Sequence, residues 1–210
     1  MKPNFSILFG VLFTCSASHA SNLVVGGDFE SPLVPTGQSY ILNVTPDGWS
    51  GMGDLAIQGY AGSVSSGNGN QWMDLNPGTG AGTGISQTIA LQGGTSYRFS
   101  FLYNGGGGGS TTDIAFSLKD GQTNLFSDSV YTGLMNVYGG TPWGYYALDF
   151  TPTANASATL AFLPNGSWSG GFIDAVSISA VPIPGAIWLL GSSLACLGVL
   201  GKRRISKEPA

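Results

Sequence analysis

The sequence predicts an all-β protein, a sandwich of two antiparallel sheets. The chain holds 34 glycines and 11 prolines among its 210 residues, and both residue types favour turns and disfavour long helices. Hydrophobic residues make up 42% of the chain and charged residues only 9%, which excludes a disordered, highly charged polymer. Short runs of alternating apolar and polar residues recur between turn residues, and about ten such strands are typical of a sandwich.

The first 20 residues have the pattern of a secretory signal peptide. Lys2 precedes the apolar run 5–13, and small residues follow up to Ala20. A charged start, a short apolar stretch and a small-residue cleavage site are the three parts of such a signal. Nine apolar residues are too few to cross a bilayer, which needs about 20. We therefore expect cleavage after Ala20 and export of the remainder.

Residues 21–180 carry the strands of the predicted sandwich. In 96–103 aromatic residues alternate with more polar ones, and 113–119 shows the same period of two, which indicates strands with one buried face. The glycine-rich stretches 78–84 and 105–109 are predicted loops, because neither has the lysine and following helix of a phosphate-binding loop. The predicted strands are 39–44, 55–60, 71–76, 85–91, 96–103, 113–119, 124–131, 145–150, 158–163 and 172–179.

Residues 185–201 are predicted to form a transmembrane helix. No residue from Ile183 to Gly201 is charged, and about 19 residues at about 1.5 Å each match the hydrocarbon thickness of a bilayer. The basic cluster of Lys202, Arg203 and Arg204 follows. By the positive-inside rule, this cluster places the end 202–210 in the cytoplasm and the domain outside it. The alternative is a buried helix of a soluble domain.

A short motif precedes this helix: Val181, Pro182, Ile183 and Pro184. The order of Val-Pro-x-Pro, a Trp-containing apolar helix and a basic cluster resembles the PEP-CTERM sorting signal of Gram-negative bacteria. The resemblance implies that 181–210 is a sorting tail and that an exosortase processes the chain at 182–184. It also implies a transient tether in the inner membrane, followed by transfer to the cell surface or to an extracellular matrix rich in exopolysaccharide.

The predicted exported domain, 21–180, is strongly acidic. Arg98 and Lys119 are its only basic residues against ten acidic ones, a net charge of −8. Nucleic acid is therefore excluded as a partner, since phosphate binding needs a basic surface. The cysteines, Cys15 and Cys196, and the single histidine, His19, lie in the two ends. The domain therefore has no disulfide, and serine hydrolase chemistry based on histidine is excluded.

Four parts of the domain resemble the galactose-binding-like jelly-roll domains, a group that includes many carbohydrate-binding modules. They are the segments 22–32 (NLVVGGDFESP), 46–49 (PDGW), 85–101 (ISQTI and GTSYRFSF) and 172–177 (FIDAVS). In such domains the Glu of the opening motif and the Asp of the closing motif often hold a structural calcium ion. Glu30 and Asp174 match those positions. The resemblance implies Ca²⁺ as a cofactor, with Asp28 as a further candidate ligand.

The closing motif gives a physical reason for a metal ion. In the predicted strand 172–179, Asp174 has the same phase as Phe172, Val176 and Ile178, and a carboxylate buried among apolar side chains needs a partner. Calcium takes six to eight oxygen ligands and requires no His or Cys. Two alternatives remain: a bulge that turns Asp174 to solvent, or a carboxylate capped by backbone N–H groups.

Four tryptophans are candidate ligand-binding residues: Trp49, Trp72, Trp143 and Trp168. Sugars can stack their apolar faces on such rings, although a Trp in a sandwich more often packs the core. Trp143 and Trp168 lie in Gly-, Pro- and Ser-rich stretches, where exposure is favoured.

These features favour an exported, non-catalytic surface or matrix protein that binds glycan or associates with exopolysaccharide. Its expected partners are an exosortase, extracellular polysaccharide and, through the C-terminal helix, the membrane. Two alternatives stay open. A glycoside hydrolase needs only two suitably spaced carboxylates, and a self-assembling structural protein could use exposed strand edges without any soluble ligand.

Overall fold

Eleven strands in two antiparallel sheets make up the described part of the chain. The computed structural model describes residues 21–51, 55–59, 67–77, 84–105, 113–133, 135–165 and 171–182. The predicted signal peptide and the predicted membrane helix lie outside these residues. Among the residues that are described, no helix is long and apolar enough to cross a membrane. Ser21–Val181 form one unit, to which all the strands belong.

The two sheets are named A and B. Sheet A has the order β1 (Tyr40–Leu42), β3 (Ala56–Gln58), β4 (Trp72–Asp74), β11 (Phe172–Ala180), β6 (Tyr97–Asn104) and β9 (Gly144–Phe150). Sheet B has the order β2 (Ser50–Gly51), β5 (Ile85–Leu91), β10 (Ala156–Asn165), β7 (Asp113–Asp120) and β8 (Thr123–Tyr131). One short 3₁₀ turn, η1 (Val137–Gly139), lies between β8 and β9.

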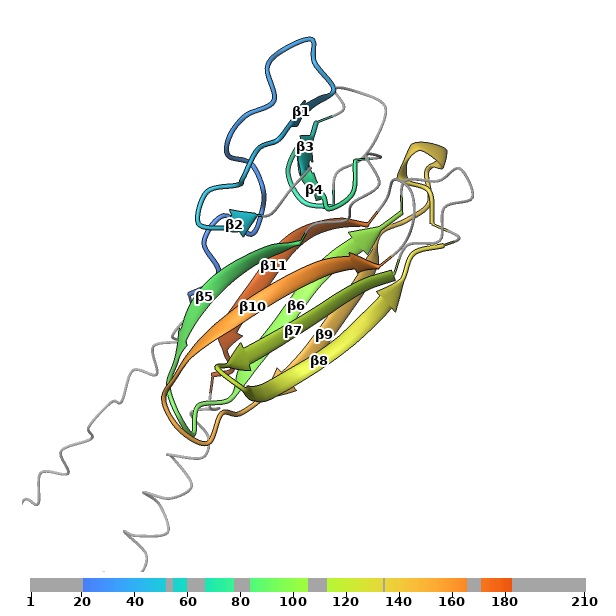
Figure 1. Ribbon diagram of the computed structural model, residues 1–210. Helices are drawn as coiled ribbons and strands as arrows, with labels where there is room; N and C mark the ends of the chain where they lie inside the picture. The colour runs from blue at the N-terminus through green and yellow to red at the C-terminus, as the bar shows by residue number, and fades with distance from the viewer. Residues whose placement is uncertain are drawn as a thin grey trace, which may run out of the picture. The chain divides into compact units, whose positions relative to one another are not determined.

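The sheets lie one on the other. Figure 1 shows β5, β10, β7 and β8 side by side in one layer, with β11, β6 and β9 in a second layer behind it. The pairings skip along the chain, for example β10 between β5 and β7, and all of them are antiparallel. The predicted antiparallel β-sandwich of the jelly-roll type is therefore confirmed.

The core fills the space between the sheets with aromatic rings. Phe99 and Phe101 of sheet A meet Phe116 and Phe162 of sheet B, with ring centroids 5.0–6.1 Å apart. All four side chains are buried, and tilted or edge-on aromatic pairs of this kind add stability beyond their buried area. The period of two seen in the sequence arises here, because alternate residues of each strand enter this layer.

Sheet A is covered on both faces at one end. Every residue of β3 and β4 is buried, whereas β5 and β9 alternate between more and less exposed residues. Trp72 of β4, Phe172 of β11 and Val137 of η1 form a second buried cluster, separate from the main core. The outer face of sheet A therefore carries an additional packed layer between β4 and η1.

A β-bulge in β11 changes which residues share a face. The register with β6 shifts between Asp174 and Ser177, and Ala175 has φ of 50°, in the left-handed region. Ile173, Val176 and Ile178 belong to the main core, but Phe172 belongs to the cluster on the outer face of sheet A. The expectation that Asp174 shares a face with Val176 and Ile178 is wrong, because the extra residue of the bulge reverses the alternation after Asp174.

All ten predicted strands are present, with ends that differ by up to two residues. β5 matches the prediction residue for residue, whereas β10 extends two residues beyond it at each end. The segments at 39–44, 55–60 and 71–76 each give only three residues of strand. β2 was not predicted, since two residues carry no alternation.

Candidate functional site

The carboxylate of Asp174 lies under the loop 67–71. Its Oδ2 accepts a hydrogen bond from the backbone N–H of Asn68 at 2.6 Å, and its Oδ1 accepts one from the N–H of Ala175 at 2.6 Å. Asp174 is 0% exposed. The bulge after it does not turn the side chain to solvent. Capping by backbone N–H groups, one of the two alternatives to a metal ion, is present in the structure.

Glu30 is held by the same loop. Its Oε1 accepts hydrogen bonds from the backbone N–H groups of Asn70 at 2.5 Å and Gln71 at 2.9 Å. Gly69 has φ of 79°, and a Cβ at that position would collide with Oε1 of Glu30. The glycines of the loop therefore let backbone N–H groups approach both carboxylates, much as they do in other anion-binding loops.

Of the three acids expected to bind metal, Asp174 has a strongly raised pKa. Burial is the main cause that raises the pKa of Asp174 to about 7, and the negative charges of Glu30 and Asp28 raise it further. Hydrogen bonds from Asn68 and Ala175 act in the opposite direction. Asp174 therefore lies in a region of negative potential, which a bound cation would relieve.

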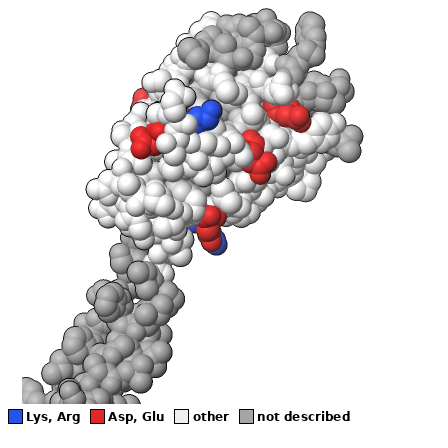
Figure 2. Space-filling model, turned by 60° about the horizontal axis from the view of Figure 1, so that its bottom comes forward, with Lys and Arg blue, Asp and Glu red and all other residues white. Residues whose placement is uncertain are grey.

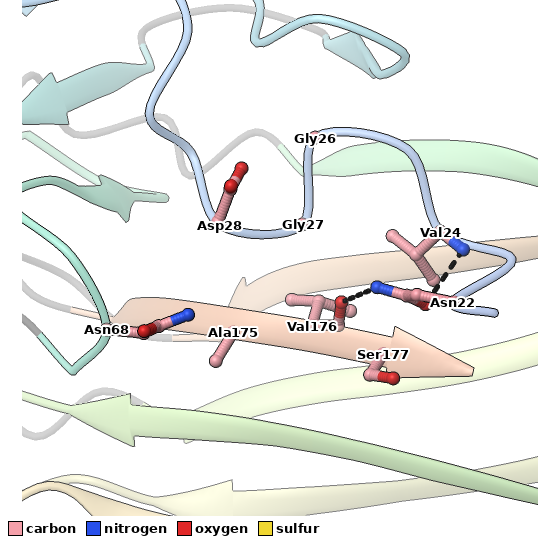
Figure 3. A pocket seen from close by; sticks show the side chains of 9 residues that line it. All are labelled: Asn22, Val24, Gly26, Gly27, Asp28, Asn68, Ala175, Val176 and Ser177. Carbon is pink, nitrogen blue, oxygen red and sulfur yellow. Dashed lines mark hydrogen bonds between the residues drawn. The ribbon is translucent and has the colours of Figure 1, made fainter. Parts of the chain in front are cut away.

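A pocket of about 340 Å³ lies beside Asp28. Figure 3 shows the turn with Gly26, Gly27 and Asp28 running over the part of β11 that carries Ala175, with Asn68 on the neighbouring loop. The turn is tied to the bulge by the Val176 N–H, which donates to the carbonyl of Gly27 at 2.8 Å. The pocket and the acids thus depend on the same irregularity in β11.

The donor set fits calcium in type but not in number of side chains. Glu30, Asp28 and Asp174 offer the carboxylate oxygens that Ca²⁺ prefers. Within the described ranges, however, no three Asp, Glu, His or Cys side chains come close enough together to form a metal group. An ion at this place would need backbone carbonyls or water for most of its six to eight ligands.

Two of the four candidate tryptophans are buried in the structure. Trp49 is 6% exposed and packs against Phe29 and Phe162, and its Nε1–H donates to the carbonyl of Gly26 at 3.2 Å. Trp72 is 0% exposed and contacts Phe172. These two rings offer no face to a ligand, because packing covers them.

The other two tryptophans differ from these. Trp143 is half-buried and lies edge-on against Trp72, with ring centroids 6.1 Å apart. Trp168 lies outside the described residues.

The structure describes only part of the predicted sorting motif. Val181 and Pro182 are exposed, and the Val181 N–H donates to the carbonyl of Ser96 at 2.8 Å. Pro184, Lys202, Arg203 and Arg204 lie outside the described residues.

A row of polar and aromatic side chains lies on the outer face of sheet B. Asn165 of β10 pairs with Asp113 of β7, and Asp113 pairs with Tyr131 of β8. Their neighbours Ile114 and Val130 are buried in the core, so the three side chains of the row point outward. Tyr131 is 58% exposed. Asp113 is half-buried, and its Oδ1 is a buried atom without a hydrogen-bond partner in the described part of the chain. We name these three residues the sheet B row.

Most other side chains on this outer face are small. One line crosses the whole sheet through directly paired residues, namely Ser50, Ser86, Ala161, Ser117 and Ser127. Leu163, half exposed, lies between this line and the sheet B row. Nothing in the sequence pattern marked the sheet B row, because its members lie at separate strand ends and only the register brings them together.

The basic residues of the domain lie away from the row. Lys119 is at the opposite end of β7 from Asp113, and Arg98 of β6 forms an ion pair with Asp149 of β9 at 2.7 Å on sheet A. Figure 2 shows acidic side chains spread over the surface in view, with few basic ones among them. The charge near the row is therefore negative, which disfavours an anionic ligand.

Several solved structures have a similar fold. A cyclase from Fischerella superimposes with a TM-score of 0.57 at 19% identity, covering 78% of this chain and 98% of that one. The TmCBM61 module in complex with β-1,4-galactotriose gives 0.52 at 16% identity, covering 77% and 100%. The MgGH51 α-L-arabinofuranosidase also gives 0.52 at 16% identity, but the match spans only 27% of that longer chain. At these identities the likeness shows the fold alone.

Comparison of sequences gives the family. No curated protein sequence matches the chain. The family model of a carbohydrate binding domain, CBM_4_9, matches residues 21–164. This match covers both the sheet B row, apart from Asn165, and the loop that holds Glu30. The chain therefore belongs to the CBM_4_9 family of carbohydrate-binding domains.

Proposed function

We propose that the domain binds a neutral glycan, without catalysis, at the sheet B row of Asn165, Asp113 and Tyr131. The observation that carries the proposal is the register, which places an exposed aromatic ring, a carboxylate and an amide in one line on the open face of sheet B. Membership of a carbohydrate-binding family supports a sugar as the ligand.

The chemistry of the row suits a sugar ring. Tyr131 offers an exposed ring on which the apolar face of a pyranose can stack. Asn165 is exposed and carries both a donor and an acceptor, so a sugar hydroxyl can bond to it. Asp113 is half-buried and its Oδ1 is buried without a partner among the described residues, so a sugar hydroxyl would reach this carboxylate through Oδ2. Trp168 follows Asn165 by three residues and stays a candidate, and Trp143 stays one because it is only half-buried.

Binding to an oligosaccharide panel tests this proposal. Affinities of the full chain for neutral oligosaccharides, with β-1,4-galactotriose as the first probe, are compared by calorimetry among three variants. We expect Tyr131→Ala to weaken binding about tenfold or more, equivalent to about 1.4 kcal/mol, and Asp113→Asn to weaken it by a smaller factor. Tyr145→Ala is the matched control, because Tyr145 is equally exposed on sheet A.

The outcomes separate the possibilities. Loss of affinity in Tyr145→Ala but not in Tyr131→Ala places the ligand on sheet A and contradicts the proposal, as does absence of binding to every neutral sugar in the panel. Release of shorter sugars during incubation would show catalysis instead of binding.

We further propose that the domain acts outside the cytoplasm. The support is in the sequence: the signal peptide 1–20, the Val-Pro-x-Pro motif, the apolar segment 185–201 and the basic end. In this proposal an exosortase cleaves near Pro182 to Pro184 after a transient tether in the inner membrane, and the domain then joins the cell surface or a polysaccharide matrix. Intact mass of the surface-released protein tests it, with a chain from Ser21 to a residue near 184 expected and an uncut chain contradicting it.

Calcium is the third part of the proposal. A Ca²⁺ ion would be bound by Glu30 and Asp174, with Asp28 near, and it would fasten the loop 67–71 to β11. Its support is the position of Glu30 and Asp174 under one loop, together with the raised pKa of Asp174, which is caused mainly by burial and further by the charges of Glu30 and Asp28. We expect chelation with EDTA to lower the melting temperature of the unmodified chain and to leave Asp174→Asn unchanged. An equal melting temperature with and without EDTA in the unmodified chain would refute it.

A further inference from the structure

A chain of three hydrogen-bonded side chains links sheet A to the segment 135–143, which joins β8 to β9. The hydroxyl of Tyr138 in η1 donates to Oε1 of Gln58 in β3 at 2.5 Å. The Nε2 of Gln58 donates in turn to Oδ2 of Asp74 in β4 at 2.6 Å. Asp74 is 1% and Gln58 8% exposed, whereas Tyr138 is 43% exposed. The chain thus runs from a buried acid to a hydroxyl at the surface.

The directions of these bonds depend on the charge of Asp74. An ionised carboxylate only accepts hydrogen bonds, and Asp74 accepts two, from Gln58 and from the backbone N–H of Asn76 at 2.9 Å. Gln58 must therefore turn its amide nitrogen to Asp74 and its oxygen to Tyr138. This arrangement allows Tyr138 to donate, at a distance within the range of O–H···O hydrogen bonds.

Protonation of Asp74 at Oδ2 places a second hydrogen between that oxygen and Gln58 Nε2. Two hydrogens at this position repel each other. The repulsion is removed when the Gln58 side-chain amide rotates by about 180°, so that its oxygen accepts the new Asp74 hydrogen. The nitrogen then faces Tyr138, whose hydroxyl must accept instead of donate. The tyrosine can redirect its own hydrogen to water, because it is partly exposed. One proton on Asp74 thus reverses both links of the chain.

The surroundings of Asp74 allow this change near neutral pH. Among the described residues, Ala56 and Phe172 pair with Asp74 and Gln58 bonds to it, and none of these three is titratable. Tyr138 of η1 contacts Gln58 and Phe172. The acid on the outer face of β11, Asp174, is paired with Leu102 and lies in the next row. Burial raises the pKa of Asp74 to about 7, against the lowering effect of the hydrogen bonds from Asn76 and Gln58.

We propose that Asp74, Gln58 and Tyr138 form a proton-controlled latch that sets how the segment 135–143 is held on sheet A. In the ionised state Tyr138 donates the hydrogen bond to Gln58, and the segment is held tightly. In the protonated state Tyr138 accepts the hydrogen bond from Gln58 instead of donating it, and the segment 135–143 is held less tightly on sheet A. Trp143 belongs to this segment and lies against Trp72, so its environment changes with the state of the latch. The latch does not depend on glycan binding.

Nuclear magnetic resonance of the full chain tests the latch. The carboxyl carbon of Asp74, the side-chain amide of Gln58 and the indole N–H of Trp143, assigned with a Trp143→Phe variant, are followed from pH 5 to pH 9. We expect the three signals to titrate together with a midpoint near pH 7. Asp74→Asn should show the low-pH positions of Gln58 and Trp143 at every pH, because its amide also presents hydrogens to Gln58.

Two further variants complete the experiment. Tyr138→Phe removes the outer link only, so Gln58 should still titrate while the change at Trp143 falls to less than half. Asp128→Asn is the matched control, since Asp128 accepts a hydrogen bond from the Tyr146 hydroxyl at 2.9 Å but is exposed; the titration should be unchanged in it.

The latch is contradicted if Asp74 titrates below pH 5 in the unmodified chain, or if Gln58 and Trp143 keep one position throughout. It is also contradicted if the Trp143 change persists at full size in Tyr138→Phe. The unmodified chain and Tyr138→Phe decide the matter even if Asp74→Asn does not fold.

Discussion

The outer faces of the two sheets are opposite in character, although their inner faces build one core. On sheet A, the strands β3 and β4 are buried on both sides, and loops cover a layer that contains aromatic rings and the polar side chains of Gln58, Asp74 and Asn104. On sheet B, the outer face carries Ser, Thr and Ala residues that are exposed or half-exposed. The outer face of sheet A is thus covered at the end that carries β3 and β4, whereas the outer face of sheet B is open to a ligand.

The two outer faces differ in how their polar groups obtain hydrogen-bond partners. A covered polar group needs a partner inside the protein, and the layer on sheet A falls short of this: Trp72 Nε1 and both polar atoms of the Asn76 side chain are buried without partners in the described part of the chain. Such groups cost about 1–3 kcal/mol each when no water reaches them. On the outer face of sheet B, Oδ1 of Asp113 is likewise buried without a partner among the described residues. The small polar side chains in the middle of that face are exposed or half-exposed, so solvent reaches them and a ligand can replace that solvent.

The largest expected effect concerns stability of the covered layer. Trp72→Ala should lower the free energy of unfolding by about 3–5 kcal/mol, because a fully buried ring leaves a cavity between Phe172, Val137 and Trp143. Urea denaturation measures this change. Tyr131→Ala, which removes a ring from the open face, is the control. A loss below about 1 kcal/mol for Trp72→Ala would show that the layer on sheet A is not packed as described.

An effect of intermediate size is expected on the pH dependence of the folding stability. The pKa of Asp74 is raised from 3.8 to about 7, so the folded chain binds a proton that the unfolded chain releases between these values. Stability therefore falls as pH rises from about 4 to about 7, and levels off above that range. Asp174, whose pKa is also raised to about 7, contributes to the same slope. Asp74→Asn should therefore reduce the slope by about half, whereas Asp128→Asn should not change it. Thermal unfolding with EDTA present measures it; an Asp74→Asn profile as steep as that of the unmodified chain would contradict the prediction.

The smallest expected effect is on the open face away from the sheet B row. Thr159 of β10 lies opposite Thr88 and Lys119, and it is exposed. Thr159→Ala should change the free energy of unfolding by less than about 0.5 kcal/mol and should leave glycan affinity unchanged. Urea denaturation and calorimetry check the two parts. A large loss of affinity would extend the binding surface across sheet B beyond the row.

The strands could be predicted from the sequence because a strand with one buried face has a period of two. This held for β5, β7 and β10, where alternate residues enter the core. It failed in β11, where Ala175 takes a positive φ without a glycine to mark it. The bulge moved Asp174 to the outer face, and no local pattern could have shown that.

The candidate site was predictable only in part. Glu30 and Asp174 were expected to hold a common calcium ion. The structure places both under the loop 67–71, and the ion itself stays a prediction. The local sequence favoured exposure for Trp143 and Trp168, and Trp143 is half-buried in the structure. Burial of Trp49 and Trp72 could not be read from local patterns, because residues distant in the chain cover them. Tyr131, Asp113 and Asn165 come together through strand register, which the sequence does not encode in any local pattern.

The central claim is that glycan binds to the open face of sheet B and not to the covered face of sheet A. Mapping backbone amide chemical shifts during titration with the tightest-binding neutral oligosaccharide tests it most directly. The account predicts the largest shifts at Asp113, Tyr131 and Asn165, with none at Trp72 or Asp74. Shifts centred on Trp72, Asp74 and the segment 135–143, with the sheet B row unchanged, would contradict it.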